Sequence, residues 1–180
     1  MPSYALFLRA INVAGHNTVV MADLQSLIEA RGFDGVTTLL NSGNVVFTGA
    51  DRPVAELESQ FEAAIGRKLE VDCNCFVRTT REWSAAIASN PFPAEAKNDP
   101  GHLLVLCLKS APSKHELAAL RGTIVGRERV EAVGKQLYAY YPDGVGRSRL
   151  TVQVIEKHLA TRATGRNWNT ALKVADLLGR

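Results

Sequence analysis

The stretch Leu69-Glu70-Val71-Asp72-Cys73-Asn74-Cys75-Phe76-Val77-Arg78 decides the fold. Apolar residues occupy every second position from Leu69 to Val77, a period that is typical of a β-strand with one buried face. Cys73 and Cys75 fall on that face, so we expect both to be buried and unbridged, since neighbours on one strand face are poor disulfide partners. A metal site is not expected, because no second pair of ligands follows at zinc-finger spacing.

The chain before this strand predicts three more strands and two helices. Strands are expected at residues 4–9, 36–40 and 45–48, the last two joined by the turn Asn41-Ser42-Gly43-Asn44. Helices are expected at 21–31, closed by Gly32, and from an N-cap at Asp51 to Gly66. The order β-α-β-β-α-β is that of a ferredoxin-like lobe, in which an antiparallel sheet of four strands carries two helices on one face.

The rest of the chain predicts a second, related lobe. The capping boxes Thr79-x-x-Glu82 and Ser113-x-x-Glu116 each open a helix, and the proline-marked stretch up to Gly101 is expected to be a linker. A strand at 103–108, a hairpin of 128–133 with 136–141, a helix from Ser148 to about 159 and a final helix over 167–178 follow. We therefore predict an α+β protein with lobes at 1–78 and 102–180, the second ending in two helices, connected by a helix and linker at 79–101.

Composition places the chain among ordinary globular proteins. Of its 180 residues 46% are hydrophobic and 22% are charged, which excludes a mainly disordered chain. No apolar run approaches the roughly 20 residues that a membrane span needs, and the N-terminus lacks the basic leader of a signal peptide. The three cysteines form no Cys-x-x-Cys pair, so we expect no disulfide scaffold and a cytoplasmic location.

Charge is distributed unevenly along the chain. Residues 1–100 hold 8 Lys and Arg against 12 Asp and Glu, a net charge of −4, whereas residues 101–180 hold 13 against 6, a net charge of +7. A basic second half indicates an anionic ligand there, although a solvated basic surface would give the same count.

Four segments are rich in polar residues and glycine where plain turns would suffice. They contain the motifs Leu8-Arg9-Ala10-Ile11-Asn12-Val13-Ala14-Gly15, Ser42-Gly43-Asn44-Val45-Val46-Phe47, Tyr141-Pro142-Asp143-Gly144-Val145-Gly146-Arg147-Ser148 and Thr164-Gly165-Arg166-Asn167-Trp168-Asn169-Thr170. In these motifs, which span essentially the whole chain, the protein resembles a widespread bacterial family known only as domain of unknown function 1697.

The resemblance implies a compact α+β protein and brings no established reaction and no cofactor. This chain departs from the family pattern at Ala10 and Ala14, where the family carries glycine. A loop that needs positive φ at these positions would strain an alanine.

The first two segments are expected to meet at one end of the first sheet. In β-α-β-β-α-β topology the loop after the first strand and the hairpin between the second and third lie at the same end. We predict a polar pocket there. Its ligand-binding residues would be Arg9, Asn12, Asn17, Ser42 and Asn44. The alternative is that Gly43 and Asn44 only build the turn.

The last two segments place arginines beside expected helix N-termini, where free N–H groups and the helix dipole favour phosphate or carboxylate. The candidate ligand-binding residues are Arg147, Ser148, Arg166 and Asn167. The alternative is helix capping, with the arginines paired to Asp143 or Glu156.

The sequence supports two classes of function. The first is a binding protein, without a cofactor or metal, for a phosphate-bearing ligand: a phosphorylated small molecule, a nucleotide or a nucleic acid. The alternative is an enzyme acting on an anionic small molecule with His16 as general base. The remaining histidines, His102, His115 and His158, are scattered and show no ligand spacing.

Overall fold

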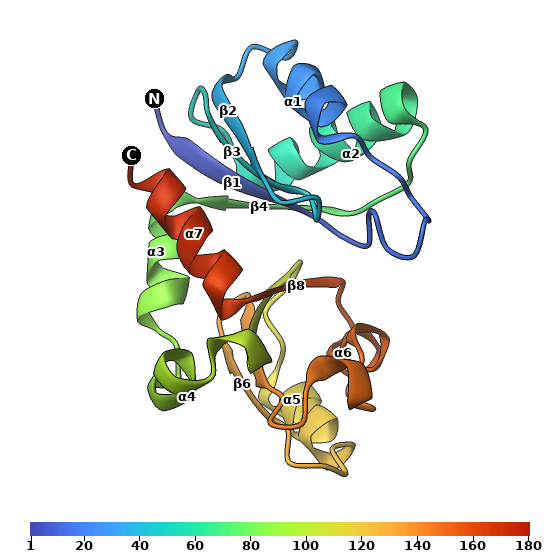
Figure 1. Cartoon of the computed structure of the whole chain (residues 1–180), viewed down its shortest axis with the longest axis vertical. Helices are drawn as coiled ribbons and strands as arrows, with labels where there is room; N and C mark the ends of the chain where they lie inside the picture. The colour runs from blue at the N-terminus through green and yellow to red at the C-terminus, as the bar shows by residue number, and fades with distance from the viewer. The chain divides into compact units, whose positions relative to one another are not determined.

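The computed structural model describes residues 1–180 and divides the chain into two compact units (Figure 1). The first unit contains Met1–Ala85 and Val174–Arg180, and the second contains Ala86–Lys173. No helix is both long enough and apolar enough to span a membrane.

The first unit is built on a four-stranded antiparallel sheet in the order β2-β3-β1-β4. The predicted order β-α-β-β-α-β is confirmed, and the third helix follows the last strand directly. The elements are β1 (Ser3–Leu8), α1 (Met21–Glu29), β2 (Asp34–Leu39), β3 (Asn44–Thr48), α2 (Val54–Leu69), β4 (Cys75–Thr79) and α3 (Thr80–Ala88).

Helices α1 and α2 cover one face of this sheet (Figure 1). Both helices bury apolar residues at helical spacing, such as Leu24 and Ile28 on α1, against the strands. Three rings from different elements, Phe33, Phe47 and Phe61, meet with centroids 4.9–5.4 Å apart in tilted and edge-on arrangements that aromatic pairs favour. The core therefore lies between the helices and the sheet.

The deciding stretch is a strand over only half of its predicted length. Helix α2 continues past Gly66 to Leu69 and is closed by Glu70 in the left-handed conformation, so the strand begins at Cys75. Asp51 is not the N-cap, because the helix starts after Pro53 with no side-chain cap. Cys73 and Cys75 are buried and unbridged, as predicted.

Carboxylates of α2 accept hydrogen bonds from the backbone N–H groups along the outer edge of β4. Glu58 accepts a hydrogen bond from the Val77 N–H (2.8 Å), and Glu62, one helical turn later, accepts from the Cys75 N–H (2.9 Å). An edge strand otherwise presents unpaired N–H groups. This pairing explains why the acidic Glu58 is 8% exposed within a helix that packs on the core.

The second unit repeats the same sheet. Its strands take the antiparallel order β6-β7-β5-β8, so the two lobes are similar α+β structures, as expected. Its elements are α4 (Pro93–Asn98), the 3-10 turn η1 (Pro100–His102), β5 (Leu103–Leu108), α5 (Lys114–Gly122), β6 (Arg129–Val133), β7 (Gln136–Tyr140), the 3-10 turn η2 (Val145–Arg147), α6 (Val152–Leu159) and β8 (Ala163–Asn167). The last helix, α7 (Trp168–Leu178), begins in this unit, and its residues from Val174 onward belong to the first unit.

Two local predictions for this half were wrong. A fourth strand, β8, stands between the last two helices, because its residues pair with β5 through the backbone although they show no apolar alternation. Ser148 does not cap a helix, since α6 begins at Val152 and is capped by Thr151.

Both predicted capping boxes are present. The Glu116 N–H donates to Ser113 Oγ while the Glu116 carboxylate accepts from the Ser113 N–H. Thr79 and Glu82 make the same reciprocal pair at the start of α3. The stretch in which a linker is expected contains α4 and η1.

Candidate functional site

The loop after β1 lies against the β2–β3 hairpin, which brings the first two polar segments together. The Leu8 N–H donates to the Gly43 carbonyl (2.9 Å), and Asn12 Nδ2 donates to the Asn41 carbonyl (2.7 Å). A Cβ on Gly43 would lie 2.7 Å from Leu8 Cβ and 2.8 Å from Ile11 Cδ1, so only glycine fits where the two segments touch.

The asparagines of this cluster hold the loop itself. Asn12 also donates to the Val19 carbonyl (2.9 Å) and accepts from the Val19 N–H (2.8 Å). Asn17 Nδ2 donates to the Ala10 carbonyl (3.2 Å). Asn44 is 1% exposed and donates to the Leu39 carbonyl and to Ser42 Oγ, both at 2.9 Å. Arg9 lies at the start of the loop, half-buried, with its N–H on the Asn74 carbonyl (3.0 Å).

The loop backbone is left-handed at several positions. Ala10 (φ 54°) and Ala14 (φ 50°), the two departures from the family glycines, both have positive φ, as do Asn12 and Asn17. His16 lies at the exposed tip, where its N–H donates to the Val13 carbonyl and its ring makes no hydrogen bond. No carboxylate therefore orients the ring of the predicted base.

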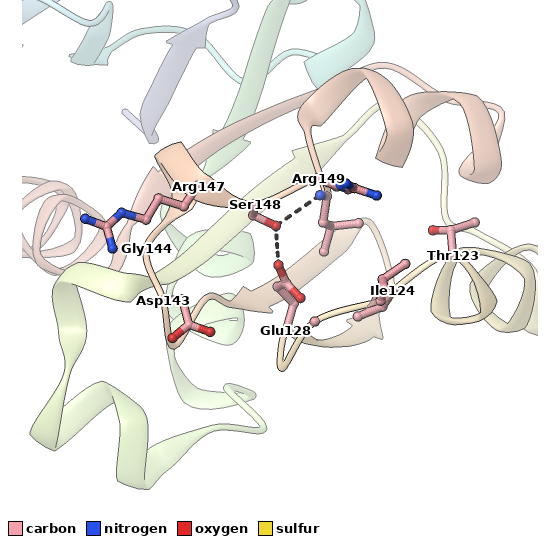
Figure 2. Close-up of a pocket in the computed structure, with 11 residues that line it drawn as sticks. Thr123, Ile124, Glu128, Asp143, Gly144, Arg147, Ser148 and Arg149 are labelled. Atoms are coloured by element: carbon pink, nitrogen blue, oxygen red, sulfur yellow. Dashed lines mark hydrogen bonds between the residues drawn. The ribbon is translucent and has the colours of Figure 1, made fainter.

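A cavity of about 260 Å³ lies in the second unit, beside the third polar segment (Figure 2). Its walls are residues 123–126, Glu128, Asp143, Gly144 and residues 147–150. The turn that carries Gly144 (φ 88°) leads into η2 and then α6. The structure thus places Arg147 and Ser148, two predicted site residues, on the wall of one hollow.

Internal hydrogen bonds fix the shape of this cavity. Arg127 holds Asp143 by two N–H donors, and this hydrogen bond keeps the pKa of the Asp143 carboxyl below its ordinary value. Ser148 Oγ donates to Glu128 and accepts from the Leu150 N–H (3.0 Å), as Figure 2 shows. Side-chain hydrogen bonds therefore tie residues 127–128, on one side of the cavity, to the segment 143–148 on the other.

Arg147 and Arg149 are the two cations of the cavity wall, and both are exposed. Neither guanidinium makes a hydrogen bond or an ion pair, and Figure 2 shows them extending to opposite sides of Ser148. Glu128 faces the same hollow with one carboxylate oxygen on Ser148 and the other, buried, without a hydrogen bond. The cavity wall thus carries two arginines without a side-chain hydrogen bond or ion pair, together with the carboxylates of Glu128 and Asp143.

Arg166 and Asn167 do not line this cavity. Arg166 belongs to β8, where it donates to Thr164 Oγ1 (3.0 Å) and to the Gly165 carbonyl (2.8 Å), and burial lowers its pKa to about 10. Asn167 Oδ1 accepts from the Thr170 N–H (2.9 Å) and so caps α7. The contact of Asn167 is that of the capping alternative, whereas Arg166 lies within a strand rather than at a helix N-terminus.

Sequence reasoning missed a second polar cluster in the same unit. Asp99 Oδ2 lies 3.0 Å from His102 Nδ1 and accepts from the Tyr140 hydroxyl (2.9 Å). The hydrogen bonds from His102 and, less strongly, from Tyr140 keep the pKa of Asp99 below its ordinary value. The only sequence signal is Asp99-Pro100-Gly101-His102, in which a tight turn brings an acid and a histidine three positions apart together.

The His102 ring points its other nitrogen toward the cavity turn. A Cβ built on Gly144 would lie 3.8 Å from His102 Nε2, and Gly144 is itself a wall residue of the cavity. Behind the cluster, Arg129 lies over the rings of Phe92 (5.1 Å) and Tyr140 (5.3 Å) and pairs with Glu95. No group of three or more His, Cys, Asp or Glu side chains gathers to hold a metal ion.

Comparisons with known proteins agree with the fold and give no reaction. A solved structure of the conserved bacterial protein SP0830 from Streptococcus pneumoniae matches 98% of each chain with a TM-score of 0.76 and 22% identity. At that identity the likeness shows the fold alone. No curated protein matches the chain. Residues 1–138 match the family described as protein of unknown function (DUF1697), and the chain therefore belongs to that family.

Proposed function

We propose that this protein binds a small phosphate-bearing ligand in the cavity of the second unit, with Arg147 and Arg149 as the charged donors. The observation that carries the proposal is the pair of exposed arginines on the cavity wall, neither of which makes a side-chain hydrogen bond or an ion pair within the protein. Surface arginines commonly pair with neighbouring carboxylates, as Arg127 does with Asp143 here. Arginine forks bind phosphate by two parallel hydrogen bonds.

The volume of the hollow supports a small ligand. About 260 Å³ is slightly below the roughly 300–1,000 Å³ found for small-molecule pockets. That space suits a few phosphoryl groups or a phosphorylated metabolite better than a nucleic-acid strand, which needs an extended basic groove. The first-unit cluster has no part in this proposal, because Asn12 and Asn17 are engaged in their own loop. We expect the protein to act in the cytoplasm, where its three unbridged cysteines fit a reducing environment.

Isothermal titration with inorganic pyrophosphate and with ATP tests this proposal. Each arginine contributes about 1.5–3 kcal/mol through charged hydrogen bonds. Arg147→Ala and Arg149→Ala should therefore each raise Kd by about 10- to 100-fold. Lys157→Ala is the matched control, since Lys157 is an exposed cation of the same unit, outside the cavity. Thermal unfolding of both arginine variants should match that of the unsubstituted protein.

Two results would overturn the proposal. The first is a Kd that is the same for Arg147→Ala, Arg149→Ala and the unsubstituted protein. The second is equal weakening by Lys157→Ala, which would indicate a general charge effect. Binding of an oligonucleotide with a steep dependence on salt, and no binding of ATP or pyrophosphate, would instead identify a nucleic-acid backbone as the ligand.

A further inference from the structure

We propose that Ser148 is a catalytic nucleophile of the same site and takes a phosphoryl group from an anhydride of phosphate, that is, a phosphoanhydride or an acyl phosphate. This inference rests on the proposed function. The observation that carries it is a serine hydroxyl that donates to the carboxylate of Glu128, with both side chains on the wall of the cavity that carries the two arginines.

The hydrogen bonds of Ser148 prepare its oxygen for attack. Ser148 Oγ donates to Glu128 Oε1 and accepts from the Leu150 N–H at 3.0 Å (Figure 2). A serine hydroxyl is a weak nucleophile until an adjacent base takes its proton, and direct hydrogen-bond contact between the two is the sign of such a pair. The Leu150 N–H is a fixed donor, which stabilises negative charge as it develops on the oxygen.

The two carboxylates of the cavity wall differ in their partners. Arg127 holds Asp143 in an ion pair. Glu128 forms no ion pair, and the Ser148 hydroxyl is its only hydrogen-bond donor, because its second oxygen is buried without a partner. No cation therefore competes with the serine proton for Glu128, which makes this carboxylate the base.

The balance of charge allows an anion to approach the hydroxyl. Asp143 is neutralised by its own ion pair, so Arg147 and Arg149 outnumber Glu128 on the wall. The two arginines are the sequence neighbours of Ser148, and they extend to opposite sides of it in Figure 2. Catalysis of phosphoryl transfer is mainly positioning and stabilisation of charge, so cations beside the nucleophile are what the reaction needs.

The step requires no reactant besides the ligand. Ser148 Oγ attacks phosphorus and a new Oγ–P bond forms, while the hydroxyl proton passes to Glu128 Oε1. The bridging P–O bond of the anhydride breaks, and its electron pair leaves on the oxygen of the departing carboxylate or phosphate. Glu128 then releases the proton to solvent through the cavity. Attack of water on the phosphoserine regenerates the hydroxyl and releases phosphate.

The class of leaving group follows from the titratable groups of the wall. In-line displacement places the leaving oxygen on the far side of phosphorus from Ser148, and so away from Glu128. The hydrogen bond from Arg127 keeps the pKa of Asp143 below its ordinary value, so Asp143 has no proton to give. A carboxylate or a phosphate leaves as a stable anion without a proton, unlike the alkoxide of a simple phosphate ester. An anhydride is therefore the substrate class that this wall suits.

Mass spectrometry of the acid-quenched protein tests the inference, after incubation with acetyl phosphate, with pyrophosphate or with ATP and Mg²⁺. The expected result is a gain of one phosphoryl group, which peptide mapping assigns to Ser148. Glycerol 3-phosphate, an ester with an alkoxide leaving group, should leave the protein unmodified. Released phosphate is measured in parallel, because a phosphoserine that is hydrolysed quickly does not accumulate.

Three variants complete the test. Ser148→Ala should abolish both the mass gain and the release of phosphate. Glu128→Gln keeps the hydrogen-bond acceptor without the base and should lower the rate of phosphorylation by about 100-fold. Ser110→Ala is the matched control, since Ser110 is an exposed serine of the same unit outside the cavity. Thermal unfolding of each variant checks that it remains folded, and peptide mapping of the unsubstituted protein needs no variant.

The outcomes separate this inference from the proposed function. Arginine-dependent binding of pyrophosphate and ATP, with neither a phosphoserine nor release of phosphate from any probe, would overturn the inference and leave the binding function standing. A phosphoryl group on another residue, or equal release of phosphate by Ser148→Ala, would overturn the role of Ser148. Equal rates in Glu128→Gln and the unsubstituted protein would overturn the role of the base. Absence of binding to both titrated probes would overturn both proposals.

Discussion

Replacement of Asn12 distinguishes a structural role for the first polar cluster from a ligand-binding role. Its side chain makes three hydrogen bonds, two to Val19 and one to the Asn41 carbonyl on the hairpin. Each hydrogen bond contributes about 1 kcal/mol to the free energy of unfolding. Because Asn12 is half-buried, water can bond to some of the groups left without a partner in a variant, which reduces the loss. Alanine adds strain at φ 53°, so Asn12→Ala should lower the free energy of unfolding by about 2–3 kcal/mol.

For a chain of this length such a loss lowers Tm by about 5–10 °C. Thermal and urea unfolding measure it, and Asn12→Gly separates the two contributions, because glycine removes the hydrogen bonds without the strain. Thr18→Ala, at an exposed position of the same loop, is the control and should change stability by less than about 0.5 kcal/mol. A change equally small in Asn12→Ala would refute the structural interpretation.

Three further predictions follow from single residues. Ala10→Gly should raise the free energy of unfolding by about 0.5–1 kcal/mol in urea unfolding, since it relieves left-handed strain at a smaller entropic cost; a loss of stability would contradict this. Gly43→Ala should cost about 3 kcal/mol or more, because its Cβ has no space, whereas Gly134→Ala, with positive φ but open space, should cost about 1 kcal/mol; equal losses would argue against the close contact. The Ser113 N–H lowers the pKa of Glu116 from its ordinary 4.5, so this contribution to stability is complete above that pH and is lost as pH falls through the lower native pKa. Glu116→Gln should flatten the dependence of unfolding free energy on pH in that range, and curves of equal slope would be the contrary result.

Periodic patterns and capping boxes account for the elements that the sequence predicts well. Leu103–Leu108 is apolar throughout and is an inner strand of its sheet, between β7 and β8. By contrast, β8 consists of Ala163-Thr164-Gly165-Arg166-Asn167, which shows no alternation because its place depends on backbone pairing with β5. The sequence pattern predicts the end of α2 too early, at Gly66. In the structure Gly66 stays helical, and Glu70 takes the left-handed cap position that glycine usually occupies.

The candidate site was predictable only where its residues are close in sequence. Arg147 and Ser148 lie in one polar segment and line one cavity, as their motif suggests. Tyr140 donates to Asp99, which lies 41 residues earlier in the chain. No sequence spacing predicts a contact between a residue of β7 and an aspartate that precedes β5. That the Arg147 guanidinium makes no hydrogen bond or ion pair also depends on its three-dimensional neighbours, which a sequence pattern does not contain.

The strand order of the two sheets has a consequence for synthesis of the chain. In each lobe the first strand is flanked by the third and fourth, so Tyr4 faces Thr79 and Leu104 faces Asn167. A nascent chain that leaves the ribosome from its N-terminus therefore holds an unpaired β1 until β3 and β4 emerge, and the same delay recurs with β5. Because Val174–Arg180 belong to the first unit, the lobe that is made first is also the one completed last. A ribosome that stalls before Val174 would thus leave the early lobe, rather than the late one, without this segment.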